Sequence, residues 1–314
     1  MALALFLLIK SAKQGESVSR VVVTGSNGFV GAKLCQLLSN NGHEVIGVDL
    51  TVSPHPTSYK QISLDFADSE FSELLDSATT LVHLASISTD GDCRNDPELA
   101  IDVNLLRLQK LKRIAEASNV KHFIFASSEW VYPEKEVIER QDEEYKISSN
   151  GLNSLYAVSK LVGEDIMRLE IKIPTTVLRF GIVYGPRVKP GSAPESLLQS
   201  VLHMKDIEVG NLDTARRFIF VDDLVTGIIG VIESEVEPGL SIYNLAGTDL
   251  ISLRDVILTA QEITGSIIKF TDLGKSASIR NPISSKFENK FGWTPETGLK
   301  SGLSDCLRVM KASV

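Results

Sequence analysis

The chain has 314 residues, of which 43% are hydrophobic and 23% charged, with a formal net charge of −8 and an isoelectric point near 5.3. This balance is typical of soluble globular proteins, and the length suits a large α/β domain with a smaller companion. The net negative charge argues against nucleic acid or an anionic membrane surface as a partner.

The cysteines and histidines argue against disulfide and metal chemistry. The three cysteines are far apart, with no CxxC spacing, which fits a reducing, cytoplasmic compartment and neither a disulfide framework nor a zinc site. The five histidines form no HxxxH or HxH cluster, so we expect no metal ligands. The cysteines are Cys35, Cys93 and Cys306.

The chain begins with an apolar run, MALALFLLIK, at residues 1–10. The run is about half as long as a bilayer-spanning helix needs, and no positive charge precedes it as in a secretory signal. We therefore interpret residues 1–18 as a non-catalytic N-terminal extension, in preference to a targeting signal.

Strand-like and helix-like segments then alternate. β-branched or apolar runs occur in SRVVVTG and HEVIGVDL, and further runs cover residues 80–86, 121–128 and 175–185. Helical stretches intervene, two of them at about 95–118 and 153–171. This alternation predicts an α/β fold, a Rossmann-type doubly wound parallel sheet.

A glycine-rich turn, Gly-Ser-Asn-Gly-Phe-Val-Gly at residues 25–31, lies between the first predicted strand and its helix. Glycines allow a tight turn and a close approach to a pyrophosphate, which the N–H groups of the helix terminus then bind. The spacing is GxxGxxG rather than GxGxxG, but the strand–turn–helix context favours a dinucleotide site over a plain turn. The expected cofactor contacts in this turn are Gly25, Asn27, Gly28, Phe29, Val30 and Gly31.

An acidic residue at the end of the second strand supports this assignment. Asp49 follows Gly31 by 18 residues (49 − 31), where a carboxylate accepts hydrogen bonds from the adenosine ribose. A carboxylate there repels a 2′-phosphate, and no Arg or Lys follows until Lys60. We therefore expect the cofactor to be NAD rather than NADP.

Several further motifs occur in one order along the chain: ASSEWVYP, YAVSK, LRFGIVYGPR, RRFIFVDDLV, YNLAG and FGWTP. Together with the glycine turn they resemble the extended short-chain dehydrogenase/reductase family, specifically its NAD-dependent epimerase/dehydratase branch. The resemblance covers nearly the whole chain from about residue 20. It implies a catalytic set of Ser128, Tyr156 and Lys160, and cofactor contacts by Asp65, Phe66, Leu84, Ala85, Ser86, Asn104, Tyr156 and Lys160.

The resemblance and a change of character at the Pro/Gly-bearing segment 185–194 suggest two domains. We expect an NAD-binding Rossmann domain at 19–180, to which 218–248 also belongs. A smaller C-terminal substrate-binding domain would then comprise 181–217 and 249–314.

The Tyr156–Lys160 spacing places a phenol and an ammonium on one helix face, about one turn apart. A free tyrosine has a pKa of about 10, too high for a base near neutrality. We expect the adjacent ammonium and the positive nicotinamide ring to lower the Tyr156 pKa, so that the phenol moves a substrate proton while hydride passes to NAD. The alternative is an ordinary helix face.

The residues after Ser128 separate the branches of the resembled family. Its 4,6-dehydratases carry an Asp–Glu pair where this chain has Glu129 and Trp130, so dehydration is not expected. A 4-epimerase needs no additional acid, because one hydride is removed and then returned to a rotated keto intermediate. The lack of a second acid at position 130 also fits a sugar dehydrogenase or keto-sugar reductase. A non-catalytic dinucleotide-binding module is a further alternative. Trp130 could also be a core residue.

The substrate is expected to be a sugar or nucleotide sugar. Arg216 and Arg280 match family arginines that hold the substrate pyrophosphate, although each could instead be a solvent-exposed arginine. The family's substrate-binding Asn is replaced by Ile182, and Glu129 adds a carboxylate beside Ser128, so the sugar and the nucleotide stay open.

By resemblance, the helices at 95–118 and 153–171 form a homodimer through a four-helix bundle. The expected apolar residues of the first helix are Leu105, Leu108, Leu111 and Ile114.

Overall fold

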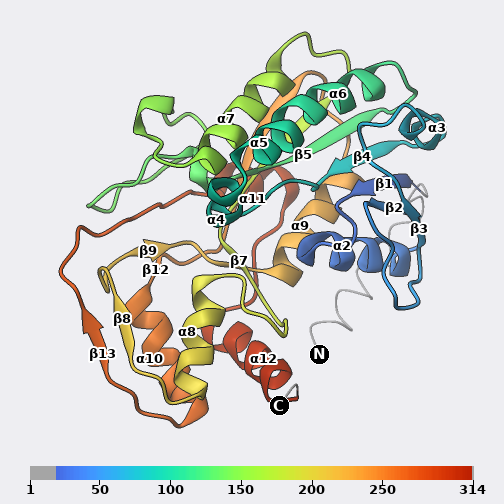
Figure 1. Ribbon diagram of the computed structural model, residues 1–314. Helices are drawn as coiled ribbons and strands as arrows, with labels where there is room; N and C mark the ends of the chain where they lie inside the picture. The colour runs from blue at the N-terminus through green and yellow to red at the C-terminus, as the bar shows by residue number, and fades with distance from the viewer. Residues whose placement is uncertain (1–18, 313–314) are drawn as a thin grey trace.

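The computed structural model describes residues 19–312. Its centre is one seven-stranded parallel sheet with the strand order β11-β6-β5-β4-β1-β2-β3 (Figure 1). The strands are β1 Arg20–Thr24, β2 Glu44–Asp49, β3 Lys60–Ser63, β4 Thr80–His83, β5 His122–Ser128, β6 Thr175–Phe180 and β11 Leu240–Leu245. This arrangement confirms the predicted Rossmann-type fold, in which ligands bind beyond the carboxyl ends of the strands.

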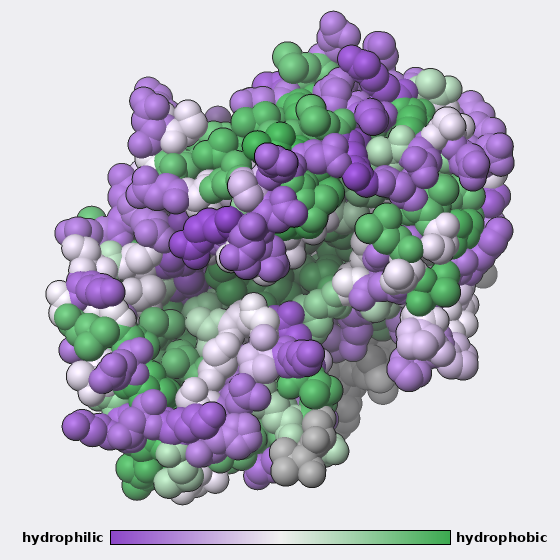
Figure 2. All heavy atoms as spheres, in the orientation of Figure 1, coloured by the Kyte–Doolittle hydropathy of each residue, from purple (hydrophilic) through white to green (hydrophobic). Residues whose placement is uncertain are grey.

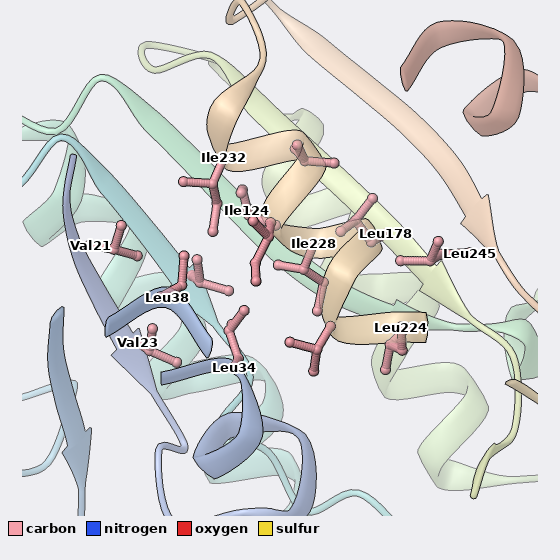
Figure 3. Close-up of a cluster of buried hydrophobic side chains, with 14 of the residues drawn as sticks. Val21, Val23, Leu34, Leu38, Ile124, Leu178, Leu224, Ile228, Ile232 and Leu245 are labelled. Carbon is pink, nitrogen blue, oxygen red and sulfur yellow. The ribbon is translucent and has the colours of Figure 1, made fainter. Parts of the chain in front are cut away.

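Two helices, α2 Phe29–Asn40 and α9 Val221–Glu233, cover one face of the sheet. Figure 3 shows their side chains, among them Leu34 and Ile228, meeting residues that project from β1, β5, β6 and β11. α9 is apolar around most of its circumference because it is covered both by the sheet and by neighbouring segments.

The opposite face is covered by helices from the middle of the chain. They are α3 Phe71–Leu75, α5 Pro97–Ile101, a π-helix Asp102–Arg107, α6 Leu108–Glu116 and α7 Leu155–Arg168, with α4 Asp90–Asn95 packed against α5 and α7. The core of this face contains Phe71, Leu108, Leu111 and Met167.

A third core lies in the C-terminal part of the chain and draws its buried residues from positions 184–310. It joins the helices α8 Ala193–Leu202, α10 Leu253–Thr264 and α12 Leu299–Ala312, in the yellow to red part of Figure 1. α10 starts with a Ser252–Asp255 capping box and ends at Gly265 in the left-handed conformation, so its sequence sets both ends.

Short elements complete the chain. The two-residue strands are β7 Val183–Tyr184, β9 Ala215–Arg216, β10 Ile219–Phe220 and β12 Ile251–Ser252, which pair as β7–β10 and β9–β12. β8 Ile207–Val209 pairs with β13 Phe270–Asp272. The remaining helices are the 3-10 turns Glu129–Val131 and Ser149–Gly151, and α11 Ser285–Phe291.

Three expected elements differ from the sequence prediction. The run 175–185 is two strands, because the chain leaves the sheet after Phe180 and Val183 pairs instead with β10. The helix expected at 95–118 is a chain of short segments containing a π-helical turn, broken at Asp96. The helix expected at 153–171 ends at Arg168, where Leu169 takes up an extended conformation. The N-terminal extension lies outside the described residues.

Figure 2 shows a hollow between the part of the molecule that carries α4–α7 and the part that carries α8, α10 and α12. Within residues 19–312, no helix combines the length and apolar character needed to cross a membrane.

Candidate active site

The glycine turn after β1 has the shape that a pyrophosphate site requires. Gly25 has φ +74°, and a Cβ atom there would lie 2.8 Å from the backbone nitrogen of Ala85. A Cβ at Gly31 would lie 2.0 Å from the Gly25 carbonyl oxygen, so α2 packs against the turn without space for a side chain. No side chain caps α2, and its first turn carries no acidic residue. These residues fit the pyrophosphate of a dinucleotide, because the N–H groups at the α2 terminus are open to an anion.

Asp49 closes β2 beside this turn. Its Oδ2 atom accepts a hydrogen bond from the Asn27 backbone N–H at 3.0 Å, and its Oδ1 accepts one from Leu50 at 2.8 Å. Within residues 19–312 no Lys or Arg forms an ion pair with Asp49. The half-buried Asp49 carboxylate thus has no cationic partner in the described part of the chain, and a carboxylate at this position disfavours a 2′-phosphate.

Asp65 and Phe66 lie beyond the end of β3. Phe66 is buried against the His83 ring, with ring centroids 4.8 Å apart. Asp65 accepts a hydrogen bond from the Ala67 backbone and forms an ion pair with Arg107 of the π-helix. Arg107 also binds Asp102 at 2.7 Å, so the π-helical turn holds the Asp65 loop in place.

The segment after β4 contains Leu84, Ala85 and Ser86, all half-buried beside the glycine turn. Asn104 holds this segment: its amide exchanges two hydrogen bonds with the Ile87 backbone, at 2.8 and 3.0 Å, and donates a third to Ser159 at 3.1 Å. Because three of its hydrogen bonds are used within the protein, we expect Asn104 to position this segment rather than bind cofactor directly.

Ser128, Tyr156 and Lys160 are brought together from β5 and α7. The Tyr156 hydroxyl is hydrogen-bonded to Ser128, and the Lys160 Nζ atom lies 5.8 Å from the Tyr156 ring centroid. Lys160 donates to the Ala126 carbonyl at 3.0 Å, which fixes the amine between strand and helix. α7 is capped by Ser154, whose hydroxyl accepts from the Ala157 N–H and binds Asp90 of α4 at 2.5 Å.

Burial shifts both ionisable groups of this set away from their charged forms. It raises the pKa of Tyr156 to about 12, with a smaller lowering by the Ser128 hydrogen bond. It also lowers the pKa of Lys160 to about 8. The expected lowering of the Tyr156 pKa by Lys160 is thus wrong for the protein alone, because desolvation exceeds any attraction to the amine.

Glu129 and Trp130 directly follow Ser128 and face the same region. The Glu129 side chain is fully buried, and burial raises its pKa to about 7 despite nearby Arg216 and Arg280. Its Oε1 atom lies 3.2 Å from the Arg216 Nε, an ion pair without hydrogen-bond alignment. Trp130 packs edge-on against Tyr156, with centroids 5.8 Å apart. It is partly buried against the small core cluster of Cys93, Ala100 and Tyr156, so a packing role for Trp130 agrees with the structure.

Arg216 and Arg280 converge on this acidic group from β9 and from the segment before α11. Arg280 is 4% exposed, and its guanidinium lies 4.6 Å from the Trp130 ring centroid. The Arg216 side chain is 12% exposed and donates to the carbonyls of Ala215 and Ser278. The alternative that both are solvent-exposed arginines is therefore wrong.

Comparison with known proteins identifies the family. Residues 21–246 match the model of the NAD dependent epimerase/dehydratase family. The chain belongs to this family. A Bacillus subtilis relative described as the uncharacterized UDP-glucose epimerase YtcB is 29% identical, covering 91% of this chain and 96% of the relative. UDP-glucuronate 4-epimerase 1 of Arabidopsis thaliana is 26% identical, covering 92% of this chain and 76% of the relative.

A solved member of the family is similar over nearly the whole chain. The structure of UDP-glucuronic acid 4-epimerase from Bacillus cereus, in complex with UDP-glucuronic acid and NAD, is 26% identical with a TM-score of 0.82. The alignment covers 94% of this chain and 100% of that one. The prediction that this epimerase/dehydratase-family enzyme uses NAD is confirmed by its family and by the solved relatives that contain NAD.

Sequence reasoning missed a buried network beside Ser128 and Tyr156. Glu164 of α7 binds Arg179 of β6 through two hydrogen bonds, at 2.9 and 2.7 Å, and accepts a third from Ser127 at 2.5 Å. Arg179 also donates to the Tyr132 hydroxyl at 2.9 Å, and that hydroxyl lies 2.9 Å from Asn244 of β11. The available signal was Arg179 itself, a charged residue inside an apolar strand, which requires a buried partner.

Proposed function

We propose that this chain is an NAD-dependent 4-epimerase of a nucleotide sugar, with a UDP-sugar as substrate. The observation that carries the proposal is the contact of Ser128, Tyr156 and Lys160 beside a glycine turn that fits a dinucleotide. The descriptions of its relatives as a UDP-glucose epimerase and a UDP-glucuronate 4-epimerase support the reaction class and the nucleotide.

The proposed roles follow from position. When bound, NAD would accept a hydride from the reacting sugar carbon and later return it to the same carbon. Tyr156 takes the proton of the reacting hydroxyl and later gives it back, while the Ser128 hydroxyl binds the same oxygen. Lys160 holds the nicotinamide ribose and, when protonated, favours the phenolate. Trp130 stands where the 4,6-dehydratases carry the second acid of their pair, so Glu129 has no adjacent acid with which to drive elimination.

For substrate binding we propose that Arg216 and Arg280 hold the diphosphate and that Glu129 lies near the sugar. Both arginines are fixed by protein contacts and lie beside the catalytic set through Glu129 and Trp130. We also propose the domain division expected from the sequence, with 19–180 and 218–248 in the NAD-binding domain. The grouping of most buried residues into separate sheet and C-terminal cores supports this division. The exceptions are Phe287, which joins the sheet core, and Phe218 and Phe220, which join the C-terminal core.

We further propose a cytoplasmic homodimer. The three cysteines are buried and free, which suits a reducing compartment. Exposed apolar side chains gather over α5, the π-helix and α7, where Figure 2 shows green atoms along the upper face. They are Leu99, Ile101, Leu106, Val162 and Leu169. Two residues expected at this interface, Leu108 and Leu111, are instead buried in the core of their own protomer.

The test is product analysis of the purified protein with UDP-glucose, UDP-galactose, UDP-glucuronate and UDP-galacturonate. A 4-epimerase converts one sugar into its C4 epimer, seen by NMR, without net change of absorbance at the reduced-nicotinamide band. Stoichiometric NAD reduction would support the dehydrogenase alternative. Bound NAD with no conversion of any of these sugars would contradict the proposed function.

A further inference from the structure

Glu134 lies in the loop after the 3-10 turn Glu129–Val131 and bridges both substrate arginines. Its Oε1 atom is 3.1 Å from the Arg216 Nη2 and 3.2 Å from the Arg280 Nη2. One carboxylate oxygen therefore occupies the point on which two guanidinium groups converge. A ligand phosphate oxygen held by both arginines would need the same point.

The two arginines are fixed, whereas Glu134 is not. Arg216 donates to the Ala215 and Ser278 carbonyls and to the Ser278 hydroxyl, at 2.8, 2.5 and 2.7 Å. Arg280 donates through Nε to the Tyr132 carbonyl at 3.0 Å, and its Nη1 is buried without a hydrogen-bond partner among the described residues. The Glu134 side chain is 49% exposed and has no polar contact besides these arginines in the part of the chain that the structure describes.

Glu134 is the more exposed of the two carboxylates that face these arginines, and burial disfavours the charged form of Glu129. Two guanidinium groups face two carboxylates, Glu129 and Glu134. A diphosphate adds at least two negative charges at the same arginines and needs the point that the Glu134 carboxylate occupies, so Glu134 has to move away from them. Glu129 is fully buried and cannot leave, whereas half-exposed Glu134 can turn into water at small cost.

We propose that Glu134 is an internal competitor for the substrate's diphosphate, holding Arg216 and Arg280 in their binding positions until a nucleoside diphosphate displaces it. This inference rests on the proposed function, which assigns the diphosphate to the two arginines. Glu134 is then a specificity-determining residue. A ligand that breaks the ion pairs of Glu134 with Arg216 and Arg280 has to replace them with its own contacts to both arginines. Unphosphorylated ligands gain nothing from displacing it.

The experiment measures UDP binding to the NAD-loaded protein by calorimetry at fixed low salt. Glu134→Gln keeps the side-chain shape but removes the charge, and is expected to lower the dissociation constant of UDP by about three- to tenfold, as for two half-exposed ion pairs. The matched control is Glu136→Gln, two residues along the same loop, exposed and without an ion pair among the described residues. It should leave UDP affinity nearly unchanged, and neither variant should alter NAD affinity.

A second variant separates this inference from the proposed function. Arg216→Lys keeps a positive charge beside Glu129, but a lysine cannot contact Ser278 and a phosphate together. It should therefore weaken UDP binding. In the double variant, the gain in UDP affinity caused by Glu134→Gln should be smaller than in the otherwise wild-type protein. Unchanged UDP affinity in Arg216→Lys would contradict the assigned diphosphate site. If Arg216→Lys weakens binding but Glu134→Gln behaves like Glu136→Gln, only the competitor role is overturned. A UDP-bound structure with Glu134 still bridging both arginines would overturn it as well.

Discussion

At the scale of single residues, burial sets the protonation states around the catalytic set. It raises the pKa of Tyr156 to about 12 and that of Glu129 to about 7, and lowers that of Lys160 to about 8. All three shifts disfavour charge in the protein alone. If these residues transfer a proton as proposed, the charged forms have to be stabilised by the bound nicotinamide ring and substrate.

The variant Tyr156→Phe tests the acid/base role. Losing only a hydroxyl changes the side-chain volume little, so the protein should fold and retain NAD, while kcat falls by about 10²–10⁴-fold because proton transfer is lost. Turnover of the identified UDP-sugar and NAD binding are the measurements. Turnover near that of the wild type would return Tyr156 to an ordinary helix residue.

The variant Lys160→Met tests how much the buried Lys160 amine destabilises the folded protein. A buried amine whose pKa falls from 10.5 to about 8 destabilises the fold at pH 7, and this penalty disappears as pH rises from 8 to 10.5. Lys160→Met should therefore raise the free energy of unfolding at pH 7 by roughly 1–3 kcal/mol, partly offset by the lost hydrogen bond to Ala126. Urea unfolding should show the gain shrinking above pH 8, while turnover and NAD affinity fall.

At the scale of secondary-structure elements, the Glu164–Arg179 pair holds α7 against β6 and β5. Both side chains are nearly fully buried, and Ser127, which binds Glu164, directly precedes Ser128. The pair therefore fixes the helix that carries Tyr156 relative to the strand that carries Ser128. A shift of this helix would separate the two hydroxyl groups.

We expect Arg179→Met to lower the free energy of unfolding by roughly 3–5 kcal/mol, because it leaves the Glu164 carboxylate buried without its partner. The double variant Arg179→Met with Glu164→Gln should recover part of that loss. Denaturant unfolding of the wild type, both single variants and the double variant gives the coupling energy. Additive losses would mean that the two side chains do not act as a pair.

At the scale of the whole molecule, the apolar face over α5, the π-helix and α7 predicts self-association. Leu106 of the π-helix is 57% exposed, and Val162 of α7 is 37% exposed. Exposed apolar patches of this kind mark interfaces between proteins. The same helices carry Asn104 and Tyr156, so a dimer through them would also stabilise the site.

Leu106→Asp should convert the dimer into a monomer at micromolar concentration, because a charge would be buried in the interface. Light scattering coupled to gel filtration measures the mass. Leu273→Asp is the control, since Leu273 is 51% exposed in the C-terminal part, away from this face. A wild-type protein that is already monomeric, or a Leu106→Asp dimer, would contradict the proposed interface.

Much of the fold could be predicted from the sequence because its signals are local, and the expected cofactor site depends on signals of the same kind. The strand–turn–helix context of Gly25–Gly31, the position of Asp49 and the four-residue spacing of Tyr156 and Lys160 depend on neighbouring residues. Alternating strands and helices allow few topologies, so the parallel sheet followed from the order of elements.

Long-range packing decided the rest. Leu108 and Leu111 show the same apolar character as Leu106, and only the orientation of α6 against the sheet buries the first two. Glu134, Arg216 and Arg280 are separated by as many as 146 positions (280 − 134), and no local pattern indicates that one carboxylate bridges both guanidinium groups. The pKa of Tyr156 likewise depends on how deeply the fold desolvates the phenol, a quantity that the spacing to Lys160 does not contain.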